Sequence, residues 1–266
     1  MLRWLTERRR RKLLEAPFPE AWHTIIEANV NAYRYLDAIE QRHLRDLTQV
    51  FIGEKHWEGC GGLVLTDEIR VTIAATACLL IMGRDHDLMN DVESLLVYPT
   101  TVVLPPPSRS FFDPSNRVVE PDEPVLGVAH ARRDPVVLAW DAVLAGAADA
   151  NDGSNVVLHE MAHKVDFLDG AADGTPPLPT TADRREWARV WSAAFLAHRS
   201  GAMHVLREYA QTNEAEFFAV ATEVFFEQPK RLQRELPEIY GLLARFYNLD
   251  LAAREPGLRS GAATAT

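Results

Sequence analysis

The sequence is poor in three features that define large protein classes. Only two cysteines, Cys60 and Cys78, occur among 266 residues, which excludes a disulfide framework, and neither has a zinc-finger spacing. A membrane span is lacking too, because the strongly apolar run Val71–Gly83 has about 13 uncharged residues where a span needs roughly 20. There is no surplus of positive charge, and a net charge of -10 argues against a nucleic-acid-binding surface. We therefore expect a globular protein of the reducing cytoplasm, with neither nucleic acid nor membrane as a partner.

The N-terminus lacks the apolar segment of a secretion signal. Its basic run Arg8–Lys12 leads to Pro17–Pro19 instead of a hydrophobic stretch, so we expect no signal peptide. Residues 1–16 are interpreted as a basic arm, either a solvated terminal helix or a surface for a membrane or an acidic partner. Because 47% of all residues are hydrophobic, residues 17–250 can form a single domain with its own core. The Gly- and Ala-rich residues 251–266 are expected to be a disordered tail.

One short motif carries most of the functional information. The segment His159-Glu160-Met161-Ala162-His163 has the H-E-x-x-H pattern inside a helix-forming run. Residues four apart share one face of an α-helix, so His159 and His163 can both direct a ring nitrogen at one metal ion, while Glu160 can meet a water at that metal. Zinc suits two imidazoles and a carboxylate, because this set leaves its fourth position open for water. The motif therefore predicts a metallohydrolase.

The residues around the motif distinguish it from a chance pattern. A His/Glu/His face on a solvated helix would need no function, but here Val156–Leu158, Met161 and Val165 predict a mostly buried helix. Buried histidines and a buried glutamate need partners. Asn151–Ser154 supplies a turn and an N-cap upstream, and Asp169-Gly170 supplies a stop downstream.

Helices dominate the remaining chain, and strand candidates precede the motif. Apolar residues at three- and four-residue spacings predict helices over residues 20–50, and Thr66 is the apparent N-cap of another helical run. Leu95–Leu104 and Asp134–Trp140 have the β-branched and aromatic content of strands. Strands before the motif helix and helices after it indicate an α+β zinc hydrolase, in which an edge strand beside the metal pairs with an extended peptide.

Several residues compete to be the third metal ligand. If the helix broke after His163, Asp169 would occupy the ligand position of peptidases that turn at a glycine, but this chain has Asp166 where that glycine is needed. His198 and His204 are also available, although His198 follows an amphipathic helix as an ordinary C-terminal cation would.

Two glutamates on a downstream helix are better candidates. Glu216 and Glu223 are seven residues apart and hence share one face of a helix that is otherwise Phe, Val and Ala nearly all round. Each also has a structural interpretation, because Asn213 with Glu216 is close to a capping box and Glu223 could pair with an arginine. Their positions alone leave the choice between them open.

Together these segments resemble the Mlc titration factor A family, bacterial zinc-dependent peptidases related in fold to the gluzincins. The similar segments are Pro135–Asp141, His159–Asp166, Tyr209-Ala210, Ala215–Val220 and Glu223. The resemblance covers roughly Pro17 to Leu249. It implies a zincin-like α+β core, with a small mixed or antiparallel sheet beside the motif helix and additional N- and C-terminal helices.

The resemblance also implies roles for individual residues. One zinc ion per chain would be held by His159, His163 and Glu216, which would break the tie with Glu223. A tyrosine precedes the family's ligand glutamate by seven residues, and Tyr209 matches it, either as a donor to the oxyanion or as a core tyrosine.

Within that scheme the other acidic groups act around the ligands. Glu160 would be the general base that takes a proton from water and passes it to the leaving amine. Glu223 and Asp166 could orient the ligand imidazoles.

Two functions follow from the resemblance. Relatives act mainly as aminopeptidases, so we expect a peptide substrate and hydrolysis from its free amino end. The family name refers to the titration of a transcriptional repressor of glucose uptake, so the chain could instead be a regulatory protein that binds such a repressor, with peptidase activity secondary or absent.

Overall fold

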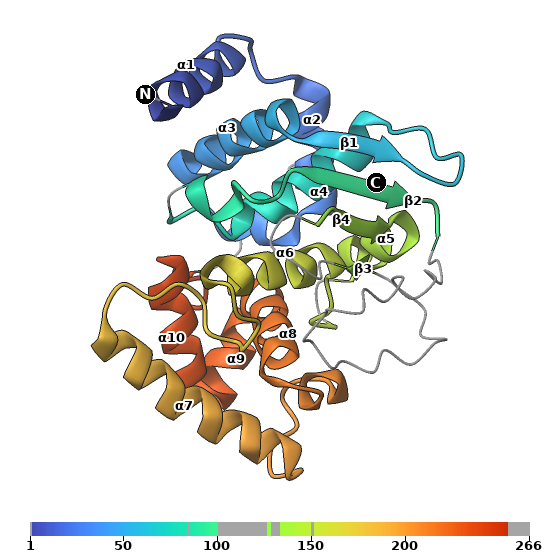
Figure 1. Cartoon of the computed structure of the whole chain (residues 1–266). Coiled ribbons are helices and arrows are strands. Elements are labelled where there is room, and N and C mark those ends of the chain that lie inside the picture. Colours follow the sequence, from blue (N-terminus) through green and yellow to red (C-terminus); the bar gives the residue numbers. More distant parts are fainter. Residues whose placement is uncertain (1, 85, 101–126, 129–133, 150–151, 255–266) are drawn as a thin grey trace, which may run out of the picture.

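The computed structural model describes residues 2–84, 86–100, 127–128, 134–149 and 152–254, and these are mostly helical (Figure 1). The α-helices are α1 (Leu2–Leu14), α2 (Glu20–Asn29), α3 (Ala38–Glu54), α4 (Asp67–Leu79), α5 (Trp140–Ala148), α6 (Val156–Asp166), α7 (Thr181–Arg199), α8 (Glu214–Glu227), α9 (Pro229–Glu235) and α10 (Pro237–Tyr247). Short 3₁₀ helices are η1 (Asn31–Tyr35), η2 (His86–Met89), η3 (Phe167–Asp169) and η4 (Glu208–Gln211). Among these described helices, none has the length and apolar character needed to cross a membrane.

The sheet is small and mixed. Its strands are β1 (His56–Gly59), β2 (Ser94–Tyr98), β3 (Gly127–Val128) and β4 (Val136–Ala139), in the order β1-β2-β4-β3. The pairs β1/β2 and β2/β4 are parallel, and only β3 pairs antiparallel, with β4. The α+β class is confirmed. Of the two expected forms of the sheet, mixed or antiparallel, the antiparallel one is wrong, because α4 carries the chain back between β1 and β2, as parallel pairing requires.

The two strand predictions near the motif were too long. The strand predicted over Leu95–Leu104 corresponds to β2, which ends at Tyr98. Residues 101–104 of that prediction lie outside the described residues. The second covers only Val136–Ala139, all four residues buried as in a covered parallel sheet, and Trp140 already begins α5.

The motif helix α6 occupies the middle of the molecule. On one side it contacts α4, β3 and β4, and on the other it packs against α8. Figure 1 shows α6 between the sheet with its N-terminal helices and the C-terminal helices α7 to α10. Because α6 is covered from both sides, nearly all of its residues are buried, including His159 and Glu160.

Local sequence explains where α6 and α8 begin. The Asn155 side chain accepts a hydrogen bond from the Leu158 amide and caps α6, and the Asn213 side chain does the same for the Glu216 amide at the start of α8. Every residue from Phe217 to Glu227 is buried, as expected of a helix that is apolar nearly all round. A capping asparagine therefore sets the first residue of each of the two helices that pack against each other.

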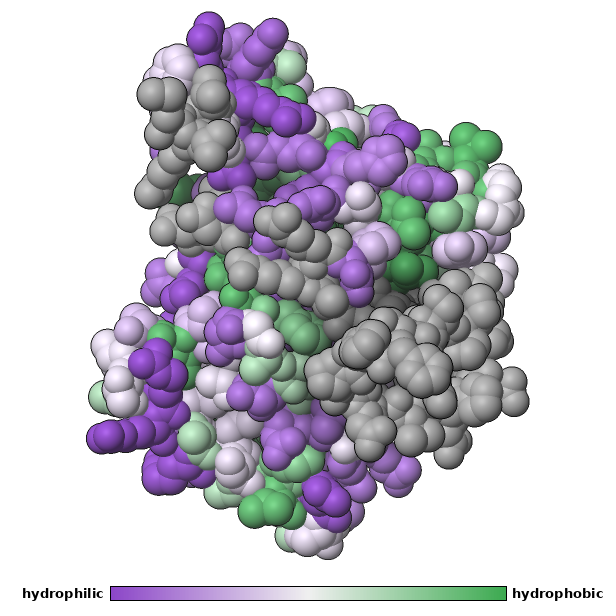
Figure 2. Space-filling model, viewed as in Figure 1, coloured by the Kyte–Doolittle hydropathy of each residue, from purple (hydrophilic) through white to green (hydrophobic). Residues whose placement is uncertain are grey.

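The N-terminal basic segment forms α1, which packs on α3. Arg10 pairs with Glu54 at 2.9 Å, and the Gln49 amide donates to the Leu13 carbonyl at 2.8 Å. Hydrophilic side chains cover this end of the molecule in Figure 2. Among the α1 side chains whose exposure the structure describes, the exposed basic ones are Arg8, Arg9, Arg11 and Lys12.

The C-terminal end of the described chain is packed. Leu251 and Ala252 are buried, and Arg254 makes an ion pair with Glu40 of α3. The part of the predicted disordered tail from residue 255 to 266 lies outside the described residues.

Candidate metal centre

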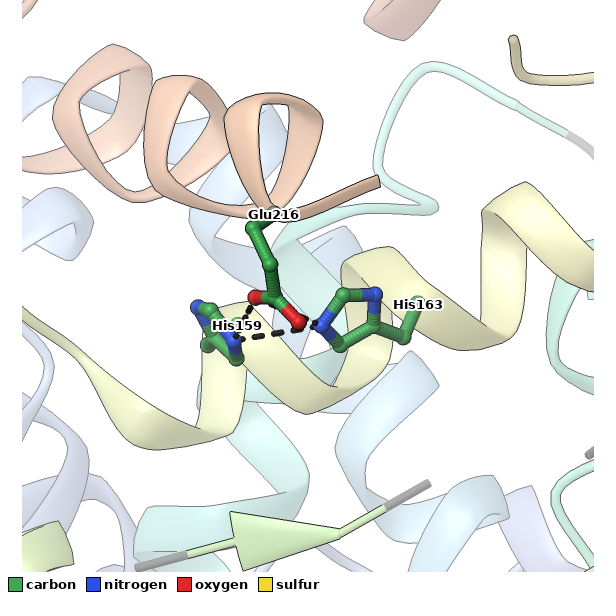
Figure 3. Close-up of side chains that lie close together, drawn as sticks. All are labelled: His159, His163 and Glu216. Carbon is green, nitrogen blue, oxygen red and sulfur yellow. Dashed lines mark hydrogen bonds and ion pairs between the residues drawn. The ribbon is translucent and has the colours of Figure 1, made fainter. Parts of the chain in front are cut away.

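Three side chains from α6 and α8 converge on one point (Figure 3). His159 Nε2 lies 3.2 Å from His163 Nε2 and 3.1 Å from Glu216 Oε2, and His163 Nε2 lies 3.3 Å from the same oxygen. Across the described part of the chain, these three residues are the one group of His, Cys, Asp or Glu side chains whose ligand atoms gather within 4.8 Å.

The separations between these atoms fit a tetrahedral ion. Ligand atoms placed about 2.0–2.1 Å from a tetrahedral metal are about 3.3–3.4 Å apart, close to the observed distances. His159 and His163 come from one helix face, as the i, i+4 spacing predicts, and Glu216 approaches from the first turn of α8. The residues therefore suit a divalent metal, with space in the donor set for a further ligand.

Protons and a metal would compete for these ligands. Burial would lower the pKa of His159, but the carboxylates of Glu223 and Glu216 outweigh it and raise that pKa. Burial would raise the pKa of Glu216, but hydrogen bonds from His159 and His163 lower it well below its ordinary value. Because metal binding must displace a proton from His159, acid is expected to weaken it.

Glu223 holds the other side of the His159 ring. It is fully buried, and its Oε1 lies 2.8 Å from His159 Nδ1 while its Oε2 accepts a 2.6 Å hydrogen bond from the Asn155 amide. Once a metal displaces the proton from Nε2, a carboxylate at Nδ1 favours the tautomer that keeps its proton there and directs the Nε2 lone pair toward the metal. Glu216 and Glu223 thus both contact His159, but at opposite ring nitrogens.

Asp166 has a different role from the expected contact with a ligand imidazole. Its Oδ2 accepts a 3.0 Å hydrogen bond from the Gly174 amide, and Oδ1 has no hydrogen-bond partner among the described residues. No hydrogen bond joins Asp166 to His163 within the same described set, since Asp166 continues the helix with φ -60° and ψ -42°. Burial raises its pKa to about 7. Asp166 therefore fixes the loop that follows η3.

Glu160 has the surroundings of a proton acceptor. Glu160 is only 4% exposed, and its Oε2 has no hydrogen-bond partner within the described chain. Burial raises its pKa above the ordinary value of 4.5. A carboxylate without competing donors and with a raised pKa is suited to take a proton from water.

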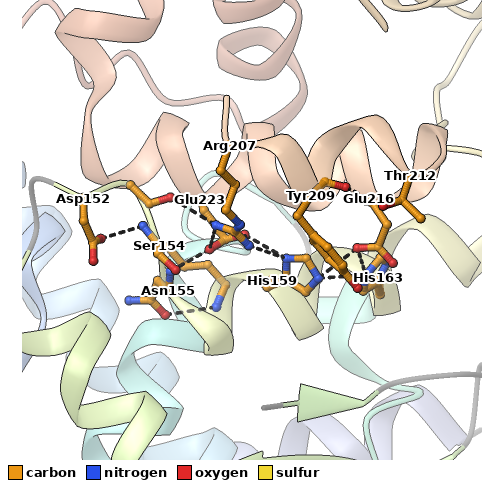
Figure 4. A network of polar contacts seen from close by, with 12 residues as sticks. Asp152, Ser154, Asn155, His159, His163, Arg207, Tyr209, Thr212, Glu216 and Glu223 are labelled. Atoms are coloured by element: carbon orange, nitrogen blue, oxygen red, sulfur yellow. Dashed lines mark hydrogen bonds and ion pairs between the residues drawn. The ribbon is translucent and has the colours of Figure 1, made fainter. Parts of the chain in front are cut away.

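Tyr209 lies at the edge of the site on η4. Its ring centroid is 5.8 Å from that of His159, and the residue is 47% exposed, so it is not a core tyrosine. Figure 4 shows it on the same side of His159 as Glu216. The ring therefore lies beside His159 at the solvent-exposed edge of the site.

The competing ligands lie elsewhere. Asp169 is exposed on η3 and accepts a hydrogen bond from the Ala171 amide. His198 is buried, with ring nitrogens 3.0 Å from the Met203 carbonyl oxygen and 3.3 Å from that of Arg207, while His204 is exposed. None of the three belongs to the converging group.

Sequence reasoning did not identify Arg207, Asn155 or Glu227 as parts of the site. Arg207 makes two hydrogen bonds to Glu223, and the Asn155 amide makes another (Figure 4). The Asn155 side chain also donates to Glu227, so Asn155 joins both glutamates to the start of α6. The sequence indicates only that a buried carboxylate such as that of Glu223 needs a cation or several hydrogen-bond donors. It does not say which residues supply them.

The buried carboxyl of Glu227 makes stability depend on pH. It is 7% exposed, accepts a 3.0 Å hydrogen bond from Asn155 Nδ2, and its Oε2 has no hydrogen-bond partner among the described residues. Burial raises its pKa from 4.5 to about 8. Because the pKa is higher in the folded state than in the unfolded chain, protonation of Glu227 stabilises the fold. This contribution to the free energy of unfolding is complete below pH 4.5 and is lost as the pH rises to about 8.

Glu227→Gln should remove that loss, because glutamine keeps the acceptor for Asn155 without the charge. We expect the variant to be more stable than the wild type at pH 9 by on the order of 1–3 kcal/mol, with a much smaller difference at pH 5. Urea unfolding at both pH values measures it. The exposed Glu238→Gln is the control, and an equal difference at both pH values would contradict the assignment.

Comparisons with known proteins cover nearly the whole chain. The family described as glucose-regulated metallo-peptidase M90 matches residues 4–248. An uncharacterised protein of Synechocystis sp. is 32% identical over 252 residues, 93% of this chain and 90% of its own length. Mlc titration factor A of Serratia proteamaculans is 29% identical over 82% of this chain and 84% of its own, and that of Yersinia pestis is 26% identical over 96% and 92%.

Proposed function

Because this chain belongs to the glucose-regulated metallo-peptidase M90 family, we propose that it hydrolyses peptides with one zinc ion per chain, as an aminopeptidase. The observation that carries this proposal is the convergence of His159, His163 and Glu216, whose ligand atoms lie within 4.8 Å of one another. Two imidazoles and one carboxylate are a donor set of catalytic zinc sites.

Side chains of this chain supply both the metal ligands and the general base. His159, His163 and Glu216 would hold the metal, which when bound supplies a Lewis acid that polarises the peptide carbonyl and acidifies water. Glu160 takes the proton of the attacking water and passes it to the leaving amine. Its burial supports this role, because a raised pKa brings a carboxyl closer to neutral pH and makes it a better base.

Tyr209 is proposed to stabilise charge on the substrate. Its ring stands 5.8 Å from that of His159 on a segment that is open to solvent, so its hydroxyl can donate to the oxyanion that develops on the attacked carbonyl.

Metal removal tests the proposed function. Dialysis against a chelator should reduce hydrolysis of chromogenic amino-acid amides by more than roughly 100-fold, because the Lewis acid is lost, and added Zn²⁺ should restore it. An N-acetylated amide is the matched control for aminopeptidase action and should not be cleaved. Full activity after chelation would contradict the metal mechanism, and equal cleavage of the blocked amide would contradict only the aminopeptidase assignment.

A second candidate function comes from the names of the relatives. Two are titration factors of Mlc, and this favours binding of a transcriptional repressor by this chain as well. In that case the protein would act on gene regulation through a complex, and peptidase activity would be secondary or absent.

The cellular setting is part of the same proposal. Both cysteines are unpaired, with Cys78 buried, which suits a reducing cytoplasm. We propose residues 17–250 as the catalytic domain, and the basic arm 1–16 adds α1 to it through the contact with α3.

A further inference from the structure

Arg207 is the cation that meets the buried carboxylate of Glu223. Its Nη1 donates to Oε2 at 2.8 Å and its Nη2 donates to Oε1 at 2.6 Å (Figure 4). Such a two-bond contact fixes the plane of the carboxylate as well as its position, which a lysine cannot do. Glu223 is fully buried on α8, so this contact determines how it faces α6.

The same carboxylate oxygens serve the start of α6. Oε1 is shared between Arg207 and His159 Nδ1, and Oε2 is shared between Arg207 and the Asn155 amide. Glu223 therefore has two partners at each oxygen. When a metal has displaced the proton of His159 Nε2, that ring is neutral, and the full positive charge among these partners is that of Arg207. Without it, a buried carboxylate would face a neutral ring and an amide, which is energetically unfavourable.

Arg207 is itself held by the protein. Its backbone carbonyl oxygen lies 3.3 Å from Nε2 of the buried His198, at the end of α7. Its guanidinium carbon lies 6.0 Å from the ring of Tyr209, the residue two positions further on. The short segment that carries Arg207 therefore also carries Tyr209, and both face His159.

We infer that Arg207 is a positioning residue of the metal centre: by orienting and neutralising Glu223, it holds His159 with Nε2 directed at the metal. The inference rests on the proposed metal site. Arg207 would contact neither metal nor substrate. Its Nη2 lies 3.4 Å from His159 Nδ1, but its two shorter hydrogen bonds go to Glu223, so its main effect on that ligand passes through the carboxylate. The prediction is that metal affinity and ligand geometry change when Arg207 is replaced, even before any activity is measured.

Zinc binding to the full-length apoprotein tests the inference. Zn²⁺ is titrated in competition with a chromogenic chelator, and Co²⁺ is added separately to record its visible spectrum, which reports ligand geometry. Arg207→Ala should weaken zinc binding roughly 10–100-fold and alter the Co²⁺ spectrum, because loss of an outer partner misaligns the ligand. Arg207→Lys should recover part of the affinity, since the charge returns without the two-bond geometry.

The matched controls separate positioning from a general loss of folding. Arg189→Ala removes an exposed arginine on α7 that pairs with an exposed glutamate, and zinc binding should not change. Glu223→Gln removes the buried charge, so adding Arg207→Ala to it should have little further effect on affinity. This double variant keeps the test informative if Arg207→Ala alone does not fold, since no buried carboxylate is then left without a cation.

The outcomes distinguish this inference from the proposed function. Zinc affinity of Arg207→Ala within about 2-fold of wild type with the same Co²⁺ spectrum would overturn the role of Arg207, as would independent losses from the two substitutions in the double variant. Failure of the wild-type protein to bind zinc would instead overturn the metal site on which the inference rests.

Discussion

Glu160→Gln is expected to lower kcat/KM for a chromogenic amino-acid amide by roughly 10²–10⁴-fold, the range that a positioned general base contributes. Glutamine has nearly the same shape but cannot accept the proton of the attacking water. Because Glu160 is not among the three converging ligands, zinc content should be unchanged. Metal analysis and steady-state kinetics of the same preparation measure both effects.

The exposed Glu214 on α8 provides the matched control for that substitution. Glu214→Gln makes the same chemical change outside the site and should leave hydrolysis intact. If Glu160→Gln hydrolyses the amide as well as the wild type, Glu160 is not the base. If the wild type and Glu160→Gln are both inert and both bind a repressor protein, the regulatory function is favoured over the enzymatic one.

Glu216→Ala should abolish stoichiometric zinc binding, whereas Glu223→Ala should retain a weakened site. The reason is geometric, because Glu216 Oε2 faces both Nε2 atoms while Glu223 lies at Nδ1, on the far side of the His159 ring. Loss of an outer partner typically weakens binding roughly 10–100-fold, but loss of a ligand removes a metal bond outright. Equilibrium dialysis followed by metal analysis compares the two variants.

Glutamine variants at the same two positions guard against unfolding, since Glu223→Ala leaves the partly exposed Arg207 beside an empty space. The ligand assignment would be wrong if Glu223→Gln lost zinc while Glu216→Gln retained it. Circular dichroism of each apoprotein shows whether the fold persists before metal is added.

The sequence was sufficient for the parts of the site that lie within one helix. The spacing of His159 and His163 placed both rings on one face of α6, and the apolar neighbours correctly predicted that the helix is buried. Periodicity could also place Glu216 and Glu223 on one face of α8. It could not say which of them meets Nε2, because that depends on how α6 and α8 cross, and only packing determines the crossing.

Other features depended on contacts that have no periodic signal. Arg207 lies in an irregular segment before η4, so its pairing with Glu223 follows from the tertiary fold alone. Asp166 was expected to orient a ligand imidazole, but its side chain accepts a hydrogen bond from the Gly174 amide instead. The sheet direction followed from the crossover through α4, which strand composition does not reveal.

The position of α6 between two halves of the molecule has a consequence for the unfolded chain. His159 and Glu216 are roughly sixty residues apart in sequence, so an ion coordinated by both would close a long loop, as a covalent cross-link does. Closing such a loop reduces the number of conformations open to the unfolded polypeptide and so favours the folded one. The metal would then stabilise the fold by linking the part of the molecule that contains the sheet to the C-terminal helices, independently of its role in hydrolysis.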